Sequence, residues 1–107
     1  MAEKSARRLM LEASLADDPA DTFLRYGLAV QCLREGDTEQ GRAMLRALIA
    51  DHPDDQVAAH QQLGQSFVEA EEYADARTIL QAGIALAGKR GDWHAASEIE
   101  GLLGQVD

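Results

Sequence analysis

Three histidines are the residues of this chain most suited to general acid–base chemistry or to binding a metal ion. His52, His60 and His94 lie far apart along the chain, and each belongs to a different predicted helix or turn. No two of them have the i, i+4 spacing at which two histidines on one helix bind the same zinc ion. The spacing therefore predicts no metal site, and we expect no cofactor.

The other groups with possible chemistry are a single cysteine and a short acidic run. Cys32 has no partner for a disulfide within the chain, which is typical of a reducing compartment, and its apolar helical position favours a small core residue over a reactive thiol. The acidic run 69–72 crosses a helix end and lacks the longer, glycine-containing loop of a calcium site. There is no glycine-rich phosphate loop and no nucleophile elbow. We therefore predict that the chain is not an enzyme.

The composition narrows the partners that the chain could have. A formal net charge of −9 repels phosphate backbones and predicts no binding to nucleic acid. The same charge either steers a basic segment of a partner protein or simply keeps the chain in solution. The first residues are charged and no apolar run approaches ~18 residues, so we expect no signal peptide, no membrane span and a cytoplasmic location.

The spacing of apolar residues indicates that the elements carrying these groups are helices. Between breaks rich in Asp, Glu, Gly and Pro, apolar residues recur at three- and four-residue spacing. This pattern predicts six helices, at 3–15, 19–34, 38–50, 55–70, 73–87 with an extension to 89, and 92–104. Sparse Val and Ile argue against an extensive sheet. Because the connections are short, consecutive helices should be antiparallel.

The sequence also matches itself when it is shifted by 35 residues. The shift pairs Leu28 with Leu63, Ala29 with Gly64, Gly36 with Glu71, Gly41 with Ala76, Leu45 with Leu80, and Leu48 with Gly83. Pro19 and Pro53 are 34 positions apart. A helix pair that repeats at this interval is typical of stacked helical repeats. Glycines within helices, at Gly64 and Gly83, indicate close contact between helix backbones.

These residues resemble the tetratricopeptide repeat, a helix–turn–helix unit. The first repeat supplies Leu28, Ala29, Gly36, Gly41, Leu45 and Pro53, and the second supplies Leu63, Gly64, Phe67, Tyr73, Ala76, Leu80 and Gly83. The tryptophan expected early in each repeat is replaced by Arg25 and His60, and the final proline of the second repeat by Gly88. The match therefore depends on two repeats agreeing in register.

The resemblance implies an all-α fold, an α–α superhelix or solenoid of antiparallel helix pairs in one domain spanning 1–107. The expected segments are an N-terminal capping half-repeat at 1–18, repeats at 19–53 and 54–88, and a C-terminal capping helix at 91–107. Leu11 precedes Pro19 by the interval that separates Leu45 from Pro53, which assigns the first segment to the second half of a repeat. The end helices should cover the apolar faces of the repeats.

In this family the first helix of each pair lines a concave groove that holds a peptide or a helix of another protein. The resemblance therefore implies a protein–protein interaction module, a scaffold or adaptor. The corresponding groove positions are Phe23, Tyr26, Val30, Gln61, Gln65 and Trp93. Aromatic side chains supply much of the energy of interfaces, and glutamine amides can both donate to and accept from a peptide backbone. An alternative is that Phe23 and Trp93 seal the ends of the core, which we favour for Trp93.

Two further expectations concern the partner. Family members that clamp the carboxyl terminus of a chaperone use Lys, Asn and Arg in the groove, and the comparable positions here carry Tyr26, Val30, Gln61 and Gln65, so we do not predict that ligand. The alternative function is self-association. A bare apolar end of a short solenoid could pair with its copy in a two-fold homodimer.

Overall fold

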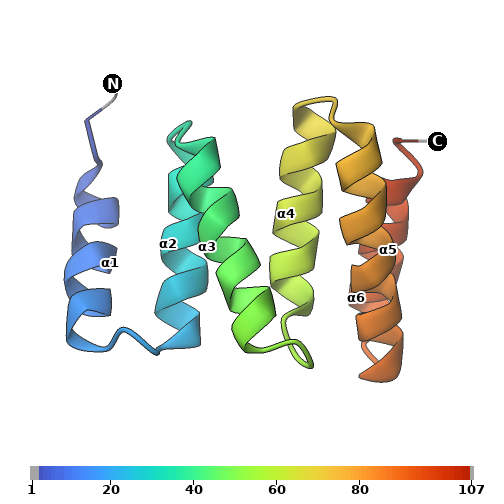
Figure 1. Cartoon of the computed structure of the whole chain (residues 1–107), viewed down its shortest axis with the longest axis horizontal. Coiled ribbons are helices and arrows are strands. Elements are labelled where there is room, and N and C mark those ends of the chain that lie inside the picture. The colour runs from blue at the N-terminus through green and yellow to red at the C-terminus, as the bar shows by residue number, and fades with distance from the viewer. Residues whose placement is uncertain (1–2, 107) are drawn as a thin grey trace.

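The computed structural model describes residues 3–106, and this part of the chain folds into six helices without a strand (Figure 1). They are α1 (Ala6–Asp17), α2 (Thr22–Arg34), α3 (Thr38–Asp51), α4 (Val57–Glu69), α5 (Tyr73–Lys89) and α6 (Trp93–Leu103). Each corresponds to a predicted helix. The predicted start of α2 at Pro19 is wrong, because the Asp21 side chain accepts a hydrogen bond from the Leu24 amide at 2.9 Å and caps the helix there.

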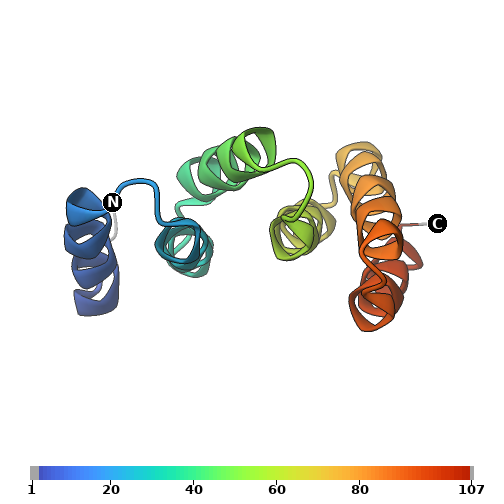
Figure 2. The ribbon, with the colours of Figure 1, turned by 90° about the horizontal axis from the view of Figure 1, so that it is seen from below.

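The helices are arranged in two rows (Figure 2). One row contains α2, α4 and α6, the other contains α3 and α5, and α1 stands at one end of the molecule. α2 packs on α3 and α4 packs on α5, and the two pairs meet where α3 contacts α4. This arrangement confirms the predicted all-α repeat fold of antiparallel helix pairs with a further helix at each end.

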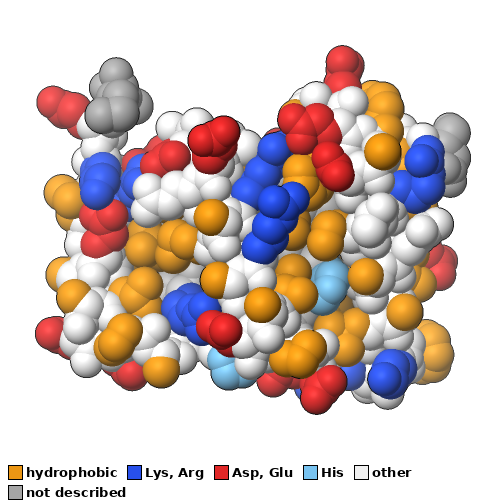
Figure 3. Space-filling model, in the orientation of Figure 1, with side chains coloured by type: hydrophobic (Ala, Val, Ile, Leu, Met, Phe, Trp, Pro, Cys, Tyr) orange, Lys and Arg blue, Asp and Glu red, His pale blue; other side chains and the backbone are white. Residues whose placement is uncertain are grey.

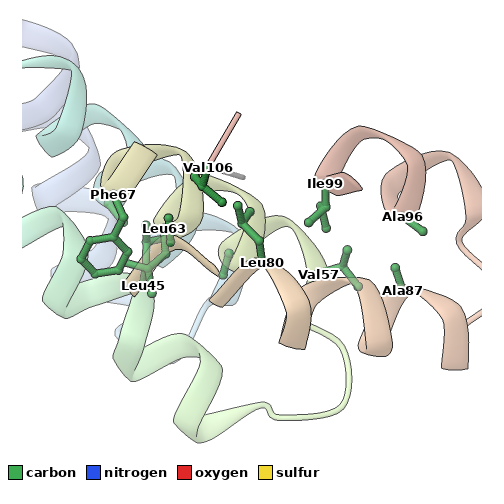
Figure 4. Packing of buried hydrophobic residues seen from close by; sticks show 12 residues of the cluster. Leu45, Val57, Leu63, Phe67, Leu80, Ala87, Ala96, Ile99 and Val106 are labelled. Carbon is green, nitrogen blue, oxygen red and sulfur yellow. The ribbon is translucent and has the colours of Figure 1, made fainter. Parts of the chain in front are cut away.

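The core lies between the two rows (Figure 4). Leu45 of α3, Leu63 of α4 and Leu80 of α5 are fully buried. At the C-terminal end α6 contributes Ala96, which lies opposite Ala87 of α5, and Ile99, which lies opposite Val57 of α4. The last helix therefore covers the end of the second helix pair, as expected of a capping helix.

The turns after α2, α4 and α5 share one backbone form. Each contains a residue with positive φ, namely Gly36 at 83°, Glu71 at 60° and Gly91 at 69°. In all three turns the amide of the next residue donates to the carbonyl five positions earlier, at 2.8 to 2.9 Å. The pairing of Gly36 with Glu71 in the 35-residue shift is thus a structural equivalence. Glu71 adopts a conformation that favours glycine.

Candidate protein-binding groove

A hollow of about 450 Å³ lies between α2 and α4, and residues of α3 complete its lining. The α2 side presents the apolar side chains of Val30 and Leu33, whereas the α4 side presents the amides of Gln62 and Gln65. The remaining lining residues are Arg34, Thr38, Arg42, Ser66, Glu69 and Ala70. The hollow therefore has one apolar wall and one wall able to form hydrogen bonds.

Helical spacing explains why these side chains meet. On α2, Val30, Leu33 and Arg34 stand at i, i+3 and i+4, so they share one face of the helix. On α4, Gln62 and Gln65 share a face in the same way. Since α2 and α4 belong to the same row (Figure 2), these two faces flank the same hollow.

The structure brings part of the predicted surface together here. Val30 and Gln65 both line the hollow. Tyr26 and Gln61 are half-buried and precede them by four residues on the same two helices, which places them on the same faces one turn away. Two of the six predicted residues thus line the hollow, and Tyr26 and Gln61 lie one helical turn before them, outside its lining.

Phe23 and Trp93 lie outside this lining. The Phe23 side chain is 82% exposed and the Trp93 side chain is 70% exposed. The expectation that Trp93 seals the core is therefore wrong. Its ring lies beside the C-terminal part of α5, where a Cβ atom on Gly88 would be 3.7 Å from the indole, while Ile99 closes that end of the core.

Arg42 is the main lining residue that sequence reasoning missed. Its guanidinium reaches from α3 to α4, donating to the Ser66 hydroxyl at 2.8 Å and the Ser66 carbonyl at 3.1 Å, and it pairs with Glu72 at 3.0 Å. It also lies 4.3 Å from the centre of the Phe67 ring, within range of a cation–π contact. Basic side chains gather over this junction of α3 and α4 (Figure 3).

The polar groups of the hollow differ in how far they are already satisfied. The Gln65 amide donates to Glu69 at 3.0 Å. Among the described residues, the Gln62 side chain has no hydrogen-bond partner and Arg34 has no ion-pair partner, and the Gln61 side chain, one turn before Gln65, also has no hydrogen-bond partner. These groups are available to a ligand. Arg34 and Arg42 also bring positive charge to the hollow. Neither residue was among the groove positions that we compared with the basic clamp of chaperone-tail binders.

In the described part of the chain, the surroundings of His60, His94 and Cys32 do not form a reactive or metal-binding site. His60 is buried, and its Nδ1 lies 2.8 Å from the Gln56 carbonyl one turn earlier. His94 is exposed beside Glu98. Burial raises the pKa of the Cys32 thiol, which disfavours the reactive thiolate. Within residues 3–106 no three His, Cys, Asp or Glu side chains are grouped to hold a metal ion, and no helix there is long and apolar enough to span a membrane.

Comparison with known proteins identifies the family. A family model described as a tetratricopeptide repeat matches residues 33–98, more than half of the chain. A TPR repeat-containing protein of Pseudomonas aeruginosa is 31% identical over 97 residues, which cover 91% of each chain. The chain belongs to the tetratricopeptide repeat family. Tetratricopeptide repeats are non-catalytic helical scaffolds that generally mediate protein–protein interaction.

Solved structures agree with this assignment. A tetratricopeptide repeat domain protein from Salinibacter ruber is 27% identical and superposes with a TM-score of 0.77, over 84% of this chain and 90% of that one. A protein from Bordetella parapertussis is 26% identical, with a TM-score of 0.82 over 95% of this chain and 88% of that one. The tetratricopeptide fold seen here is thus shared over most of the length of both.

Proposed function

We propose that this tetratricopeptide chain, acting as one domain with repeats at 19–53 and 54–88, binds a peptide segment of a partner protein in the hollow between α2 and α4. The observation that carries the proposal is the division of the hollow into an apolar wall and an amide wall. An apolar side chain of the segment would lie against Val30 and Leu33. Its main chain would exchange hydrogen bonds with Gln62 and Gln65, since an amide can donate and accept.

The charges at the hollow refine the class of segment. Arg34 lies at i+4 from Val30, next to the apolar wall, and its guanidinium is available. A carboxylate that follows the apolar side chain would pair with it. The net charge of −9 repels a long acidic tract at a distance, so the preferred segment carries one carboxylate rather than several.

Screening the full chain against a library of random displayed peptides tests the proposal. Enriched peptides should share an apolar residue close to an acidic one. Val30→Glu and Gln65→Ala should each weaken binding of the best peptide by roughly 10-fold or more, measured by titration calorimetry. Gln81→Ala is the matched control, because Gln81 is an exposed glutamine on α5.

Circular dichroism of each variant should show unchanged helicity, because the lining residues are at most half-buried or small. Two results would overturn the proposal: a library without enriched peptides, or enriched peptides that bind the Val30 and Gln65 variants as tightly as they bind the natural chain. Self-association, the alternative function, would use an apolar end of the solenoid and not this hollow.

A further inference from the structure

The outer face of α1 is an apolar surface that no other described element covers. α1 packs along α2, and it turns Arg8, Leu11 and Leu15 toward that helix. Leu9 and Met10 belong to the opposite side, where they are 53% and 63% exposed. The exposed residues of this outer face are Ala6, Leu9, Met10, Ala13 and Ala16, with the charged Asp17 at its C-terminal end. α1 stands at the end of the molecule, so this face is accessible to another chain (Figures 1 and 2).

The spacing on this face is that of a helix–helix seam. Ala6, Met10, Ala13 and Asp17 follow one another at intervals of four, three and four residues. This is the repeat by which helices pair side by side in coiled coils. Leu9 and Ala16, seven residues apart, flank the seam on one side. The spacing of residues on the outer face therefore matches that needed to pack one partner helix.

The order of side-chain sizes along the seam indicates what that helix is. The bulky residues, Leu9 and Met10, lie in the first half of α1 after the small Ala6, and the second half carries only small apolar residues on this face, Ala13 and Ala16. An antiparallel copy of α1 brings Met10 opposite Ala13 of the second copy and Leu9 beside Ala16 of the second copy. Two-fold symmetry makes each contact twice. A parallel copy would instead oppose Met10 to Met10.

The charges at the ends of α1 favour the same orientation. Its first turn contains no acidic residue and its last turn no basic one. Arg7 lies in the first turn and Asp17 is the last residue, which is the reverse of what the helix dipole favours. Within residues 3–106 neither side chain has an ion-pair partner. In the antiparallel pair Arg7 lies beside Asp17 of the second copy, which satisfies both charges and both helix ends.

We propose that this chain forms a weak two-fold dimer through antiparallel pairing of the outer faces of α1. A helix of 12 residues is about 18 Å long, so the contact buries less than the ~1,200 Å² of a stable interface. We expect a dissociation constant on the order of 100 µM. The hollow between α2 and α4 lies on other helices and stays open in the dimer. A result that contradicts the dimer therefore leaves the proposed peptide site unaffected, and the reverse also holds.

Sedimentation velocity of the full chain, from about 10 µM to about 1 mM, tests the association. The sedimentation coefficient should rise from that of a monomer toward that of a dimer, and Met10→Glu should weaken association by at least ~10-fold. Trp93→Glu is the matched control, because Trp93 is an exposed large side chain at the other end of the molecule. A monomer at every concentration, or loss of the dimer with Trp93→Glu and not with Met10→Glu, would overturn the proposal.

A size exchange tests the register. Ala13→Met places a bulky side chain opposite Met10 of the second copy and should weaken association, as should Met10→Ala. The double variant Met10→Ala with Ala13→Met restores a bulky-to-small contact and should associate within ~3-fold of the natural chain. If nonspecific hydrophobic contact caused the association, the Ala13→Met variant alone would associate more tightly than the natural chain. That result would contradict the proposal. Both positions are exposed, so each variant should retain its helicity.

Cross-linking tests the orientation. An equimolar mixture of Met10→Cys and Ala13→Cys chains, treated with a short bismaleimide, should yield mainly mixed dimers, because position 10 faces position 13 of the second copy. Cys32 is fully buried and should not react. Dimers in which each variant links predominantly to itself would show another orientation and would overturn the antiparallel arrangement.

Discussion

At the scale of single residues, Arg8 shows how one buried side chain attaches an end helix to the rest of the molecule. It is 5% exposed, and its guanidinium donates to Asp37 at 2.8 Å and to Gln40 at 3.1 Å. The hydrogen bond to Asp37 raises the pKa of Arg8, and Glu35 lies 3.8 Å away. Because it is paired in this way, the buried charge connects α1 to the turn between α2 and α3.

Glu35 makes this attachment sensitive to pH. The Ser5 hydroxyl donates to Glu35 at 2.6 Å and the Gln31 amide donates at 2.7 Å, and these bonds lower the pKa of Glu35 below its ordinary value of 4.5. A lowered pKa stabilises the fold above pH 4.5, and this stabilisation is lost as the pH falls through the lowered value. We expect thermal melts to show this loss at acidic pH.

Glu35→Gln should remove that part of the acid sensitivity. Melts of the natural chain and of the variant, compared from neutral to acidic pH, should converge at low pH and separate above pH 4.5, where the natural chain is the more stable. A constant difference between the two at every pH would show that Glu35 contributes packing and not a titrating charge.

At the scale of elements, a glycine sets the distance at which α4, α5 and α6 pack. A Cβ atom on Gly83 of α5 would lie 2.9 Å from the His60 Cβ on α4 and 3.3 Å from Ile99 on α6. Gly64 of α4 is similar, because its added Cβ would overlap the side chain of Leu80. The family position usually held by tryptophan is His60 here, and the absence of a side chain at Gly83 leaves room for it.

Gly83→Leu should therefore destabilise the protein by overpacking, by about 1–3 kcal/mol. The control is Gly101→Leu on α6, where an added Cβ would meet no atom within 4 Å. That change should be neutral or stabilising by up to ~1 kcal/mol, since leucine is the better helix former. Chemical denaturation of both variants measures the difference. Equal stability of the Gly83 variant and the natural chain would refute the close contact.

At the scale of the whole molecule, the burial of apolar side chains is uneven along the stack of helices. The largest fully buried side chains are Leu45, Leu48, Leu63, Leu80, Ile99 and Cys32, and none of them belongs to α1. α1 packs along α2, and the polar contacts of Arg8 also connect it to the start of α3. In a stacked helical repeat each element depends on its neighbours, so an end helix with few apolar contacts opens first.

Hydrogen exchange should reveal this order. In a dilute solution of monomers, amides of α1 should be at least ~10-fold less protected than those of α4 and α5. Arg8→Ala should lower the protection of α1 further and leave α5 unchanged. Mass spectrometry of peptic fragments resolves the two helices. Uniform protection across all helices would instead show that the chain opens as one cooperative unit.

Much of the fold was determined by the sequence itself, because its signals are local. The period of the apolar residues predicted all six helices, and Asp92 caps α6 as predicted, accepting from the Ala95 amide at 3.1 Å. The 35-residue repeat indicated the family and the stacking of helix pairs. On the binding surface, i+4 spacing along a single helix was enough to associate Tyr26 with Val30 and Gln61 with Gln65.

The tertiary structure decided which surfaces meet. Arg42 lies on α3, yet its side chain joins the hollow between α2 and α4, and Trp93 lies on the surface although its size suggested a core residue. These outcomes depend on the rotation and displacement of one helix against another. Side-chain packing between distant segments sets both quantities, and the period of a single helix does not encode them.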